Sequence, residues 1–187
     1  QYAEGLSVRD GAARVIDICD VDSDKWRQYA LAHRYPLKAV YLSEARTLAA
    51  AEARYVREFD ASIVISDVEA QILRDLAGGD PHRIRVVSNG VDTEYFDPAR
   101  QLPTPFPKDS RPVVFTGAMD YEANADGVRW FVREVLPGVR SHTPAAAFFI
   151  VGSNPSAGVR ALATEPGVIV TGRVPDVRPY LAHADVV

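Results

Sequence analysis

Three glycines in the second half of the chain lie where a predicted β-strand ends and a loop begins. Gly117, Gly152 and Gly172 each follow a run rich in β-branched or aromatic residues. Glycine at such a position lets a ligand approach the backbone closely, and the following helix offers free N–H groups to an anion. Ligands of open parallel sheets bind at the carboxyl ends of the strands. The pattern therefore predicts a nucleotide or phosphate ligand, although ordinary turn glycines give the same spacing.

Motifs for other chemistries are absent from the sequence. The chain contains neither G-x-G-x-x-G nor G-x-x-x-x-G-K-[ST], which disfavours a dinucleotide fingerprint and a P-loop. Asp20-x-Asp22-x-Asp24 resembles the start of an EF-hand, but Lys25 occupies the position that requires glycine, so helix capping is favoured. No G-x-S-x-G elbow supports a serine hydrolase. Cys19 is interpreted as a small buried strand residue rather than a catalytic thiol. We predict no metal site, because the histidines lack ligand spacing: His33, His82, His142 and His183.

The composition is that of an ordinary globular chain. Of 187 residues, 47% are hydrophobic and 25% are charged, which excludes disordered and low-complexity classes. The formal net charge of −4 argues against a nucleic-acid-binding protein. The longest apolar runs, such as Ala145–Val151, fall far short of the ~20 residues of a membrane span. No signal peptide is recognised, and the absence of an initiator methionine leads us to expect a piece of a larger protein.

Residues 1–91 are predicted to alternate strands and helices. Short β-branched runs predict strands at 15–19, 62–65 and 84–87. The Asp22–Asp24 run predicts the cap of a helix from Lys25 to His33, and Pro36 suits the first turn of the next helix. Ser66 or Asp67 is predicted to cap a third helix that ends at Gly78–Gly79. Spacings of three and four predict that the long second helix has one inward face: Tyr41, Ala45, Leu48, Glu52, Tyr55 and Phe59.

Residues 112–187 resume the alternation after a break. Five prolines within residues 97–112 predict a stiff linker rather than a core element. Strands are predicted at 112–116, 146–151 and 168–171, with helices near 125–136, 159–164 and 177–183. Residues 184–187 look like the opening of another strand. This alternation predicts the α/β class, with parallel sheets in two Rossmann-like domains.

One segment carries a specific resemblance to a known family. Val87–Pro98 resembles the N-G-V-D-x-x-x-F-x-P segment of family 4 (group 1) glycosyltransferases. Ser66–Glu69 is similar to the S-x-x-E helix start of that family, and Thr171–Asp176 is similar to its G-x-V-x-D turn. Asp20–Tyr29 and Phe115–Asp126 further resemble sugar transferases associated with exopolysaccharide and PEP-CTERM/exosortase loci. The resemblance covers nearly the whole chain.

The resemblance implies the GT-B fold, in which two Rossmann-like domains face each other across the active site. Residues 1–91 would be the C-terminal part of the N-terminal, acceptor-side domain, and residues 92–111 the interdomain linker. Residues 112–187 would be the N-terminal part of the domain that binds the donor. The glycine-rich acceptor loop and the E-x7-E segment of the family would lie outside this chain, the latter beyond the strand that begins at Asp185. With both domains incomplete, we expect the chain by itself to be inactive and marginally stable.

The resemblance also implies retaining transfer of a sugar from a nucleotide diphosphate sugar to a saccharide or lipid-linked acceptor, in polysaccharide or exopolysaccharide biosynthesis. The family usually needs no metal, so no cofactor besides the donor substrate is expected. The implied location is cytoplasmic, with peripheral contact at the inner membrane through the N-terminal domain. Two alternatives stay open: a non-catalytic GT-B-like binding subunit, and a nucleotide-sugar epimerase of the same fold. An unrelated α/β protein, such as a periplasmic-type binding protein, is disfavoured by Val87–Pro98.

The resemblance assigns donor binding to two loops and assigns no catalytic residue within this chain. Asn124 keeps a second interpretation as a helix cap, and Arg173 as a solvated loop arginine. Asn89 and Gly90 are interpreted as turn and hinge residues. The donor-binding residues are Gly117, Asp120, Tyr121, Asn124, Arg173 and Val174.

The sequence departs from the family at the donor loop. Ala118 follows Gly117 where many members have arginine, so the positive partner of the diphosphate must come from elsewhere. Trp130 and Phe131 are interpreted as core residues. Glu52 is interpreted as a partly exposed residue of the helical stripe, with pairing to a base such as Arg54 or Arg57 as the alternative.

Overall fold

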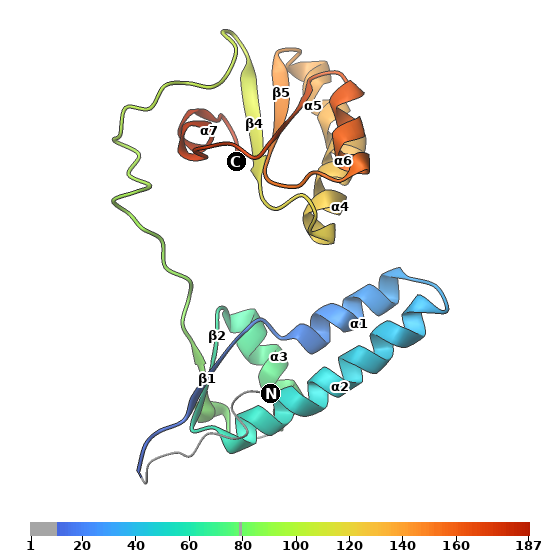
Figure 1. Ribbon diagram of the computed structural model, residues 1–187, viewed down its shortest axis with the longest axis vertical. Coiled ribbons are helices and arrows are strands. Elements are labelled where there is room, and N and C mark those ends of the chain that lie inside the picture. Colours follow the sequence, from blue (N-terminus) through green and yellow to red (C-terminus); the bar gives the residue numbers. More distant parts are fainter. Residues whose placement is uncertain (1–10, 79) are drawn as a thin grey trace. The chain divides into compact units, whose positions relative to one another are not determined.

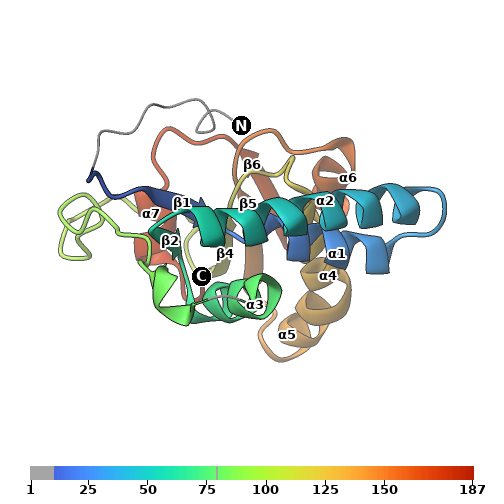
Figure 2. The same ribbon diagram turned by 90° about the horizontal axis from the view of Figure 1, so that it is seen from below.

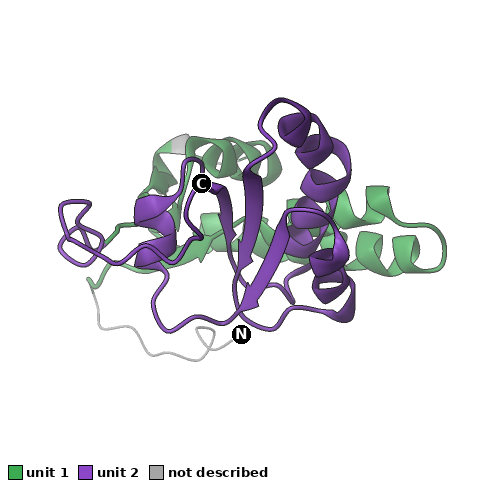
Figure 3. Ribbon diagram, turned by 90° about the horizontal axis from the view of Figure 1, so that it is seen from above, with its two compact units in different colours: residues 1–91 green, residues 92–187 purple. Residues whose placement is uncertain are grey.

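The computed structural model describes residues 11–78 and 80–187. The chain divides into two compact units, residues 1–91 and residues 92–187, which Figure 3 colours separately. Each unit contains its own sheet, and every described strand pairing is parallel. The predicted α/β class with parallel sheets is therefore confirmed. Gly79 of the predicted helix end, and residues 1–10 of the first predicted domain, lie outside the described residues.

Unit 1 is a parallel sheet in the order β1-β2-β3 with its helices on the connections between strands (Figures 1 and 2). Its core is made by apolar residues of strands β2 and β3 and of helices α2 and α3, including Val56, Val64, Leu73 and Ile84. The elements are β1 (Val15–Cys19), α1 (Asp22–Ala32), α2 (Leu37–Glu58), β2 (Ala61–Val64), α3 (Asp67–Ala77), the 3₁₀ turn η1 (Pro81–Arg83) and β3 (Ile84–Val86).

Helices α1 and α2 form an antiparallel hairpin that runs side by side in both views (Figures 1 and 2). Small side chains let the two helices approach closely, since Ala30 is fully buried and Ala45 is 8% exposed. Rings of Trp26, Tyr29 and Tyr41 pack together with centroids 5.3–6.1 Å apart. The hairpin is thus held by its own contacts along its length.

Two helix starts in unit 1 differ from the sequence-based prediction. The N-cap position of α1 is Val21, which makes no side-chain cap, and Asp22 and Asp24 lie in the first turn of the helix. In the first turn, their negative charges interact favourably with the positive N-terminal end of the helix dipole. Neither side chain caps the helix. Pro36 is the N-cap of α2 and precedes the first turn. The prediction for α3 is confirmed: the Ser66 hydroxyl accepts a hydrogen bond from the Glu69 N–H, and Gly78 ends the helix in the left-handed conformation.

Cys19 corrects another prediction. It is the last residue of β1, where the strand shifts register after Asp17 and Cys19 pairs with Val64 of β2. Cys19 is exposed there and has a φ of 59°. Its thiol donates to the Asp17 carboxylate at 3.3 Å, which raises the pKa of the thiol. An exposed thiol with a raised pKa is a poor nucleophile at neutral pH.

Unit 2 is a parallel sheet in the order β4-β5-β6, and Val186 adds a parallel bridge to Val113 of β4. The bridge agrees with the predicted strand opening at residues 184–187. One buried cluster includes Met119, Val128, Phe148 and Ile150, and another includes Val114, Phe149 and Val151. The elements are β4 (Arg111–Thr116), α4 (Glu122–Trp130), the π-helical turn η2 (Phe131–Val135), α5 (Leu136–His142), β5 (Ala146–Val151), α6 (Ala157–Ala161), the 3₁₀ turn η3 (Leu162–Thr164), β6 (Val168–Gly172) and α7 (Arg178–His183).

The predicted single helix near residues 125–136 is three consecutive pieces in the structure. Pro137 lies in the first turn of α5 and has no N–H to donate, and the preceding turn Phe131–Val135 is π-helical. Trp130 is 60% exposed, so its prediction as a core residue is wrong. The Phe131 ring packs on Phe148 with centroids 4.4 Å apart, so the same prediction for Phe131 is confirmed.

Residues 92–111 make core contacts that the predicted stiff linker did not include. The Phe106 ring lies 4.7 Å from the Phe149 ring and 5.7 Å from the Tyr180 ring, measured between centroids. His183 Nε2 lies 2.6 Å from the Leu102 carbonyl oxygen. This segment is therefore attached to unit 2, because apolar packing outweighs the extended preference of its prolines.

Candidate functional site

The carboxyl ends of the three strands of unit 2 meet at one edge of the sheet. The Gly117 N–H donates to the Val151 carbonyl at 3.1 Å, and the Gly152 N–H donates to the Gly172 carbonyl at 3.1 Å. The Met119 N–H donates to the Ser153 carbonyl at 2.8 Å. The loops after β4, β5 and β6 are therefore joined by backbone hydrogen bonds, and this edge is the candidate site.

Local geometry explains why each of the three positions at this edge is occupied by glycine. A Cβ on Gly152 would lie 1.7 Å from the Gly117 carbonyl oxygen, and a Cβ on Gly117 would lie 2.7 Å from Asn124 Nδ2. Gly172 has a φ of +70°, which side chains rarely adopt. Packing against backbone therefore requires glycine at position 152, packing against the Asn124 side chain favours it at 117, and the backbone conformation favours it at 172, whether or not a ligand also approaches the backbone.

Tyr121, and not Asn124, occupies the N-cap position of α4. Helix α4 begins at Glu122, so Asn124 lies inside the helix and is not its cap, which corrects that interpretation. The Asn124 side-chain amide donates to the Ala118 carbonyl at 3.0 Å and so closes the loop after β4. Tyr121 is the N-cap residue, is 45% exposed and makes no side-chain cap. The first turn of α4 thus has no side-chain acceptor at its N-cap.

Asp120 links the loops after β4 and β5. Its carboxylate accepts a hydrogen bond from the Asn154 side-chain amide at 3.0 Å, and both residues are exposed. Asn154 has a φ of +52°, which asparagine tolerates better than most residues. A carboxylate repels a diphosphate, so Asp120 is suited to hydroxyl groups of a sugar rather than to phosphate.

Arg173 and Val174 follow β6 and have different environments. Arg173 is exposed, whereas the Val174 side chain packs against the cluster of Val114, Phe149 and Val151. Only the backbone of Val174 is thus suited to contact a ligand, while the Arg173 guanidinium is free to reach one.

A second arginine near this loop is already engaged. Arg178 contacts Asp176 with both ends of its guanidinium, at 3.0 Å from Nε to Oδ1 and 2.7 Å from Nη2 to Oδ2. These hydrogen bonds lower the pKa of Asp176 and raise the pKa of Arg178. The same guanidinium lies 3.8 Å from the centroid of the Tyr95 ring and donates to the Tyr95 carbonyl at 3.2 Å. Arg178 therefore fixes residues 92–98 on unit 2 and is not available to a ligand.

Asn89 and Gly90, the predicted turn and hinge residues, are exposed and outside any helix or strand. A Cβ on Gly90 would meet no atom within 4 Å, so packing does not require glycine there. Asp92 follows them and its carboxylate accepts hydrogen bonds from the backbone N–H groups of Glu94 and Tyr95, at 3.1 and 2.8 Å. The hinge role stays a prediction.

Both units match glycosyltransferase families. Residues 110–187 match the family described as glycosyl transferases group 1, and residues 27–95 match Glycosyltransferase Family 4. The two matches together reach into both units. Each unit is therefore similar to a glycosyltransferase domain.

Curated glycosyltransferases are similar to part of the chain. D-inositol 3-phosphate glycosyltransferases of Mycobacterium tuberculosis and Mycobacterium bovis are 34% identical over 122 residues, which is 63% of this chain. The chain spans 23% of the length of these relatives.

Solved structures with low sequence identity share the fold. The crystal structure of TarM has a TM-score of 0.54 at 15% identity and covers 74% of this chain and 26% of that one. Anabaena Alr3699/HepE, solved in complex with UDP and glucose, has a TM-score of 0.52 at 16% identity over 91% of this chain and 44% of that one. A Rickettsia africae glycosyltransferase has a TM-score of 0.52 at 14% identity over 88% of this chain and 54% of that one. The predicted GT-B fold class is confirmed.

Unit 1 holds a buried carboxylate, Glu52, whose burial the sequence-based interpretation did not predict. Glu52 is 5% exposed, and it accepts hydrogen bonds from the Ser23 N–H at 3.1 Å and the Ser23 hydroxyl at 2.5 Å. Burial raises the pKa of Glu52. The expected partly exposed position is wrong, because α1 packs over this part of α2. Glu44 and Glu52 share the spacing E-x7-E by coincidence, since they lie on a helix of unit 1.

Glu69 is a second carboxylate whose structural role was not predicted from the sequence. It accepts a hydrogen bond from the Val21 N–H at 2.6 Å, at the entry to α1. The S-x-x-E pattern could have indicated a reciprocal capping box. Instead, the hydroxyl of Ser66 caps α3 while the carboxylate of Glu69 holds the turn after β1.

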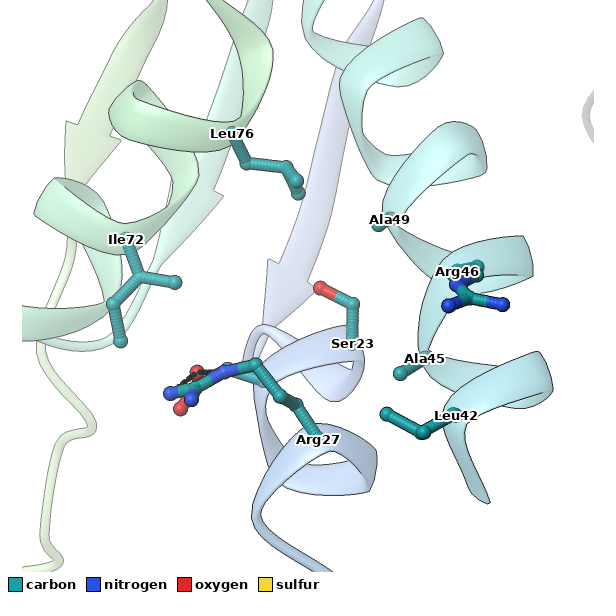
Figure 4. A pocket seen from close by; sticks show the side chains of 9 residues that line it. Ser23, Arg27, Leu42, Ala45, Arg46, Ala49, Ile72 and Leu76 are labelled. Carbon is teal, nitrogen blue, oxygen red and sulfur yellow. Dashed lines mark hydrogen bonds and ion pairs between the residues drawn. The ribbon is translucent and has the colours of Figure 1, made fainter. Parts of the chain in front are cut away.

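A cavity of about 400 Å³ lies among the three helices of unit 1 (Figure 4). Leu42 of α2 and Ile72 and Leu76 of α3 give it apolar walls, and the Ser23 hydroxyl that binds Glu52 lies at its edge. Arg27 also borders it, but this arginine pairs with Asp24 at 2.6 Å. No sequence pattern predicted the cavity, because three separate helices form it.

Among residues 11–78 and 80–187, no group of three or more histidine, cysteine, aspartate or glutamate side chains is placed to hold a metal ion. Within the same residues, no helix is both long enough and apolar enough to span a bilayer.

Proposed function

We propose that this chain is part of a retaining glycosyltransferase that moves a sugar from a nucleotide diphosphate sugar to a saccharide or lipid-linked acceptor. Unit 2 would bind the donor and unit 1 would form the acceptor side. The observation that carries the proposal is the edge of unit 2 where three strand ends are joined beside the N-terminus of α4. Backbone N–H groups and a helix dipole favour an anion at such an edge.

The leaving diphosphate needs positive charge as the bond to the sugar breaks. Ala118 provides none, and Arg178 is occupied by Asp176 and Tyr95. Arg173 is exposed on the loop after β6, so we assign it the contact with the diphosphate or the base. Asp120 and Tyr121 would contact hydroxyl groups of the donor sugar. No metal is required in this proposal, since the arginine and the helix N-terminus carry the charge.

The biological setting that we propose is exopolysaccharide biosynthesis in the cytoplasm, with peripheral contact at the inner membrane. The support is the similarity of Asp20–Tyr29 and Phe115–Asp126 to sugar transferases of PEP-CTERM/exosortase loci. The D-inositol 3-phosphate glycosyltransferases that match the chain are named for a different acceptor. The acceptor is therefore proposed only as a class.

Nucleotide binding by the 187-residue chain tests the donor site. Calorimetric titration with UDP and GDP should give saturable binding of one of them. Arg173→Gln should weaken that binding about tenfold, because a charge-assisted hydrogen bond is lost. Arg133→Gln, an exposed arginine of η2, makes the same charge change away from the loops and should leave the affinity unchanged. Absence of binding by the folded chain, or equal loss in both variants, would contradict the assignment.

Turnover separates the three candidate activities. We expect the 187-residue chain to bind nucleotide without transferring sugar, and a longer protein that carries the E-x7-E segment to transfer it with retention. Isomerisation of the donor without an acceptor would favour an epimerase. Nucleotide binding with no chemistry in the longer protein would favour a non-catalytic subunit.

A further inference from the structure

The turn between α1 and α2 presents large apolar side chains to solvent. Leu31, Tyr35, Leu37 and Val40 are 68%, 82%, 48% and 53% exposed. They gather where α1 ends at Ala32 and α2 begins, at the end of the hairpin farthest from strands β1 and β2 (Figure 1). We call residues 31–40 the hairpin tip. Exposed apolar side chains in one cluster mark an interaction surface.

Positive charge is concentrated on the same part of the chain. Residues 25–43 contain four lysines and arginines and no aspartate or glutamate, in a chain whose net charge is −4. Lys25 and Arg27 pair with Asp22 and Asp24 at the base of α1. Arg34 and Lys38 lie within the tip, are exposed, and form no side-chain ion pair with any described residue. The tip is therefore both apolar and positively charged.

We propose that the hairpin tip docks on an anionic lipid bilayer. Leucine and valine side chains would enter the boundary between head groups and acyl chains, and Tyr35 would lie at head-group level. Arg34 and Lys38 would contact lipid phosphates. This assignment gives the peripheral contact of the proposed function a place in the chain. It does not depend on sugar transfer.

The chemistry of the tip favours lipid over other partners. A nucleic acid would use the two cations but would leave four large apolar side chains without a partner. A second copy of this chain would bring the same two cations against each other at a symmetric contact, which like-charge repulsion opposes. An anionic bilayer satisfies both kinds of side chain at once, so complementary charge and apolar insertion point to the same occupant.

Vesicle flotation of the 187-residue chain tests the proposal in the absence of any donor. Vesicles of phosphatidylcholine with about one third phosphatidylglycerol should bind the chain, vesicles of phosphatidylcholine alone should bind it much less, and salt should weaken binding. The double variant R34Q/K38Q should lower the partition coefficient by about fivefold for each charge removed. The double variant K108Q/R133Q makes the same change in net charge within unit 2 and should bind as the unmodified chain does.

A second pair of variants tests the apolar part of the tip. Leu31 is 68% exposed and Val68 of α3 is 69% exposed, so Leu31→Ser and Val68→Ser remove side chains of similar exposure. Leu31→Ser should lower partition about fivefold to tenfold, and Val68→Ser should not change it. Circular dichroism of every variant checks that the helices persist.

Three results would overturn the proposal. The first is an unmodified chain that does not bind anionic vesicles. The second is equal loss of binding in tip and control variants. The third is a lipid-free dimer, seen by sedimentation, that the tip variants dissociate, since this would assign the tip to a second copy. Titration of the same R34Q/K38Q sample with nucleotide tests the proposed donor site independently of lipid binding. A failure to bind nucleotide would contradict the assignment of Arg173 and unit 2, and not the lipid-binding proposal.

Discussion

At the scale of single residues, Glu52 shows what helical spacing can and cannot predict about a side chain. Its position in the stripe Tyr41–Phe59 indicated the inward face of a helix, and the structure agrees that this face is buried at Ala45 and Ala53. Whether a carboxylate on that face is solvated depends on a partner from another element. That partner is Ser23 of α1, which supplies both a backbone and a hydroxyl donor. Spacing along one helix carries no information about such a partner.

The raised pKa of Glu52 predicts a specific pH dependence. Its pKa in the folded state lies above the usual value of 4.5, so the folded state binds the proton more tightly than the unfolded state. Stability from this group is fully present below about pH 4.5 and is lost as the pH rises through the raised pKa. The stability of Glu52→Gln relative to the unmodified chain should therefore increase with pH across this window.

Urea unfolding followed at several values between about pH 4 and about pH 8 measures this difference. Glu44→Gln makes the same substitution at an exposed glutamate eight residues earlier on the same helix and is the control for the burial of Glu52. A stability gap for Glu52→Gln that stays constant with pH would contradict the buried, proton-binding carboxylate.

At the scale of elements, sequence patterns predicted helices and strands correctly where neighbouring residues alone determine the structure. The β-branched runs at Val15–Cys19 and Ala146–Val151 are strands as predicted, and Ser66 caps α3. The patterns did not predict burial correctly where a segment distant in sequence determines whether a side chain is covered. Trp130 is exposed because no described element covers that side of α4, and Phe106 is packed because Phe149 and Tyr180 offer it rings.

The cap of α3 predicts a measurable loss. Ser66→Ala removes the acceptor of the Glu69 N–H and should destabilise unit 1 by about 1 kcal/mol. Ser43→Ala replaces an exposed serine within α2 and should be neutral or slightly stabilising, since alanine favours a helix. Chemical denaturation of both variants gives the comparison. An unchanged midpoint for Ser66→Ala would show that the cap contributes nothing to stability.

At the scale of the whole molecule, the core is divided. Among residues 11–78 and 80–187, one buried cluster belongs to unit 1 and two belong to unit 2. The sequence has one tryptophan in each unit. Trp26 lies in the α1–α2 hairpin and Trp130 at the end of α4. The alternation of strands and helices predicted the two blocks. It could not predict that residues 92–111 pack on the second, because prolines and scattered aromatic residues give no periodic signal.

Separate cores predict separate responses to a core substitution. Val64 is fully buried in unit 1, so Val64→Ala should destabilise that unit by about 2 kcal/mol. In the Trp130→Phe background, fluorescence of Trp26 should report the lower midpoint. In the Trp26→Phe background, fluorescence of Trp130 should shift much less. Equal shifts of both probes would mean that the molecule unfolds as one cooperative body.

The contacts of residues 92–106 with unit 2 have a consequence for protein engineering. Chimaeras that exchange unit 2 between related proteins need a crossover point in the chain. A junction at residue 111 would separate Phe106 from Phe149 and Tyr180, and Tyr95 from Arg178. A junction just before Asp92 would transfer these partners together. The segment that joins the two units in sequence is therefore inherited with unit 2.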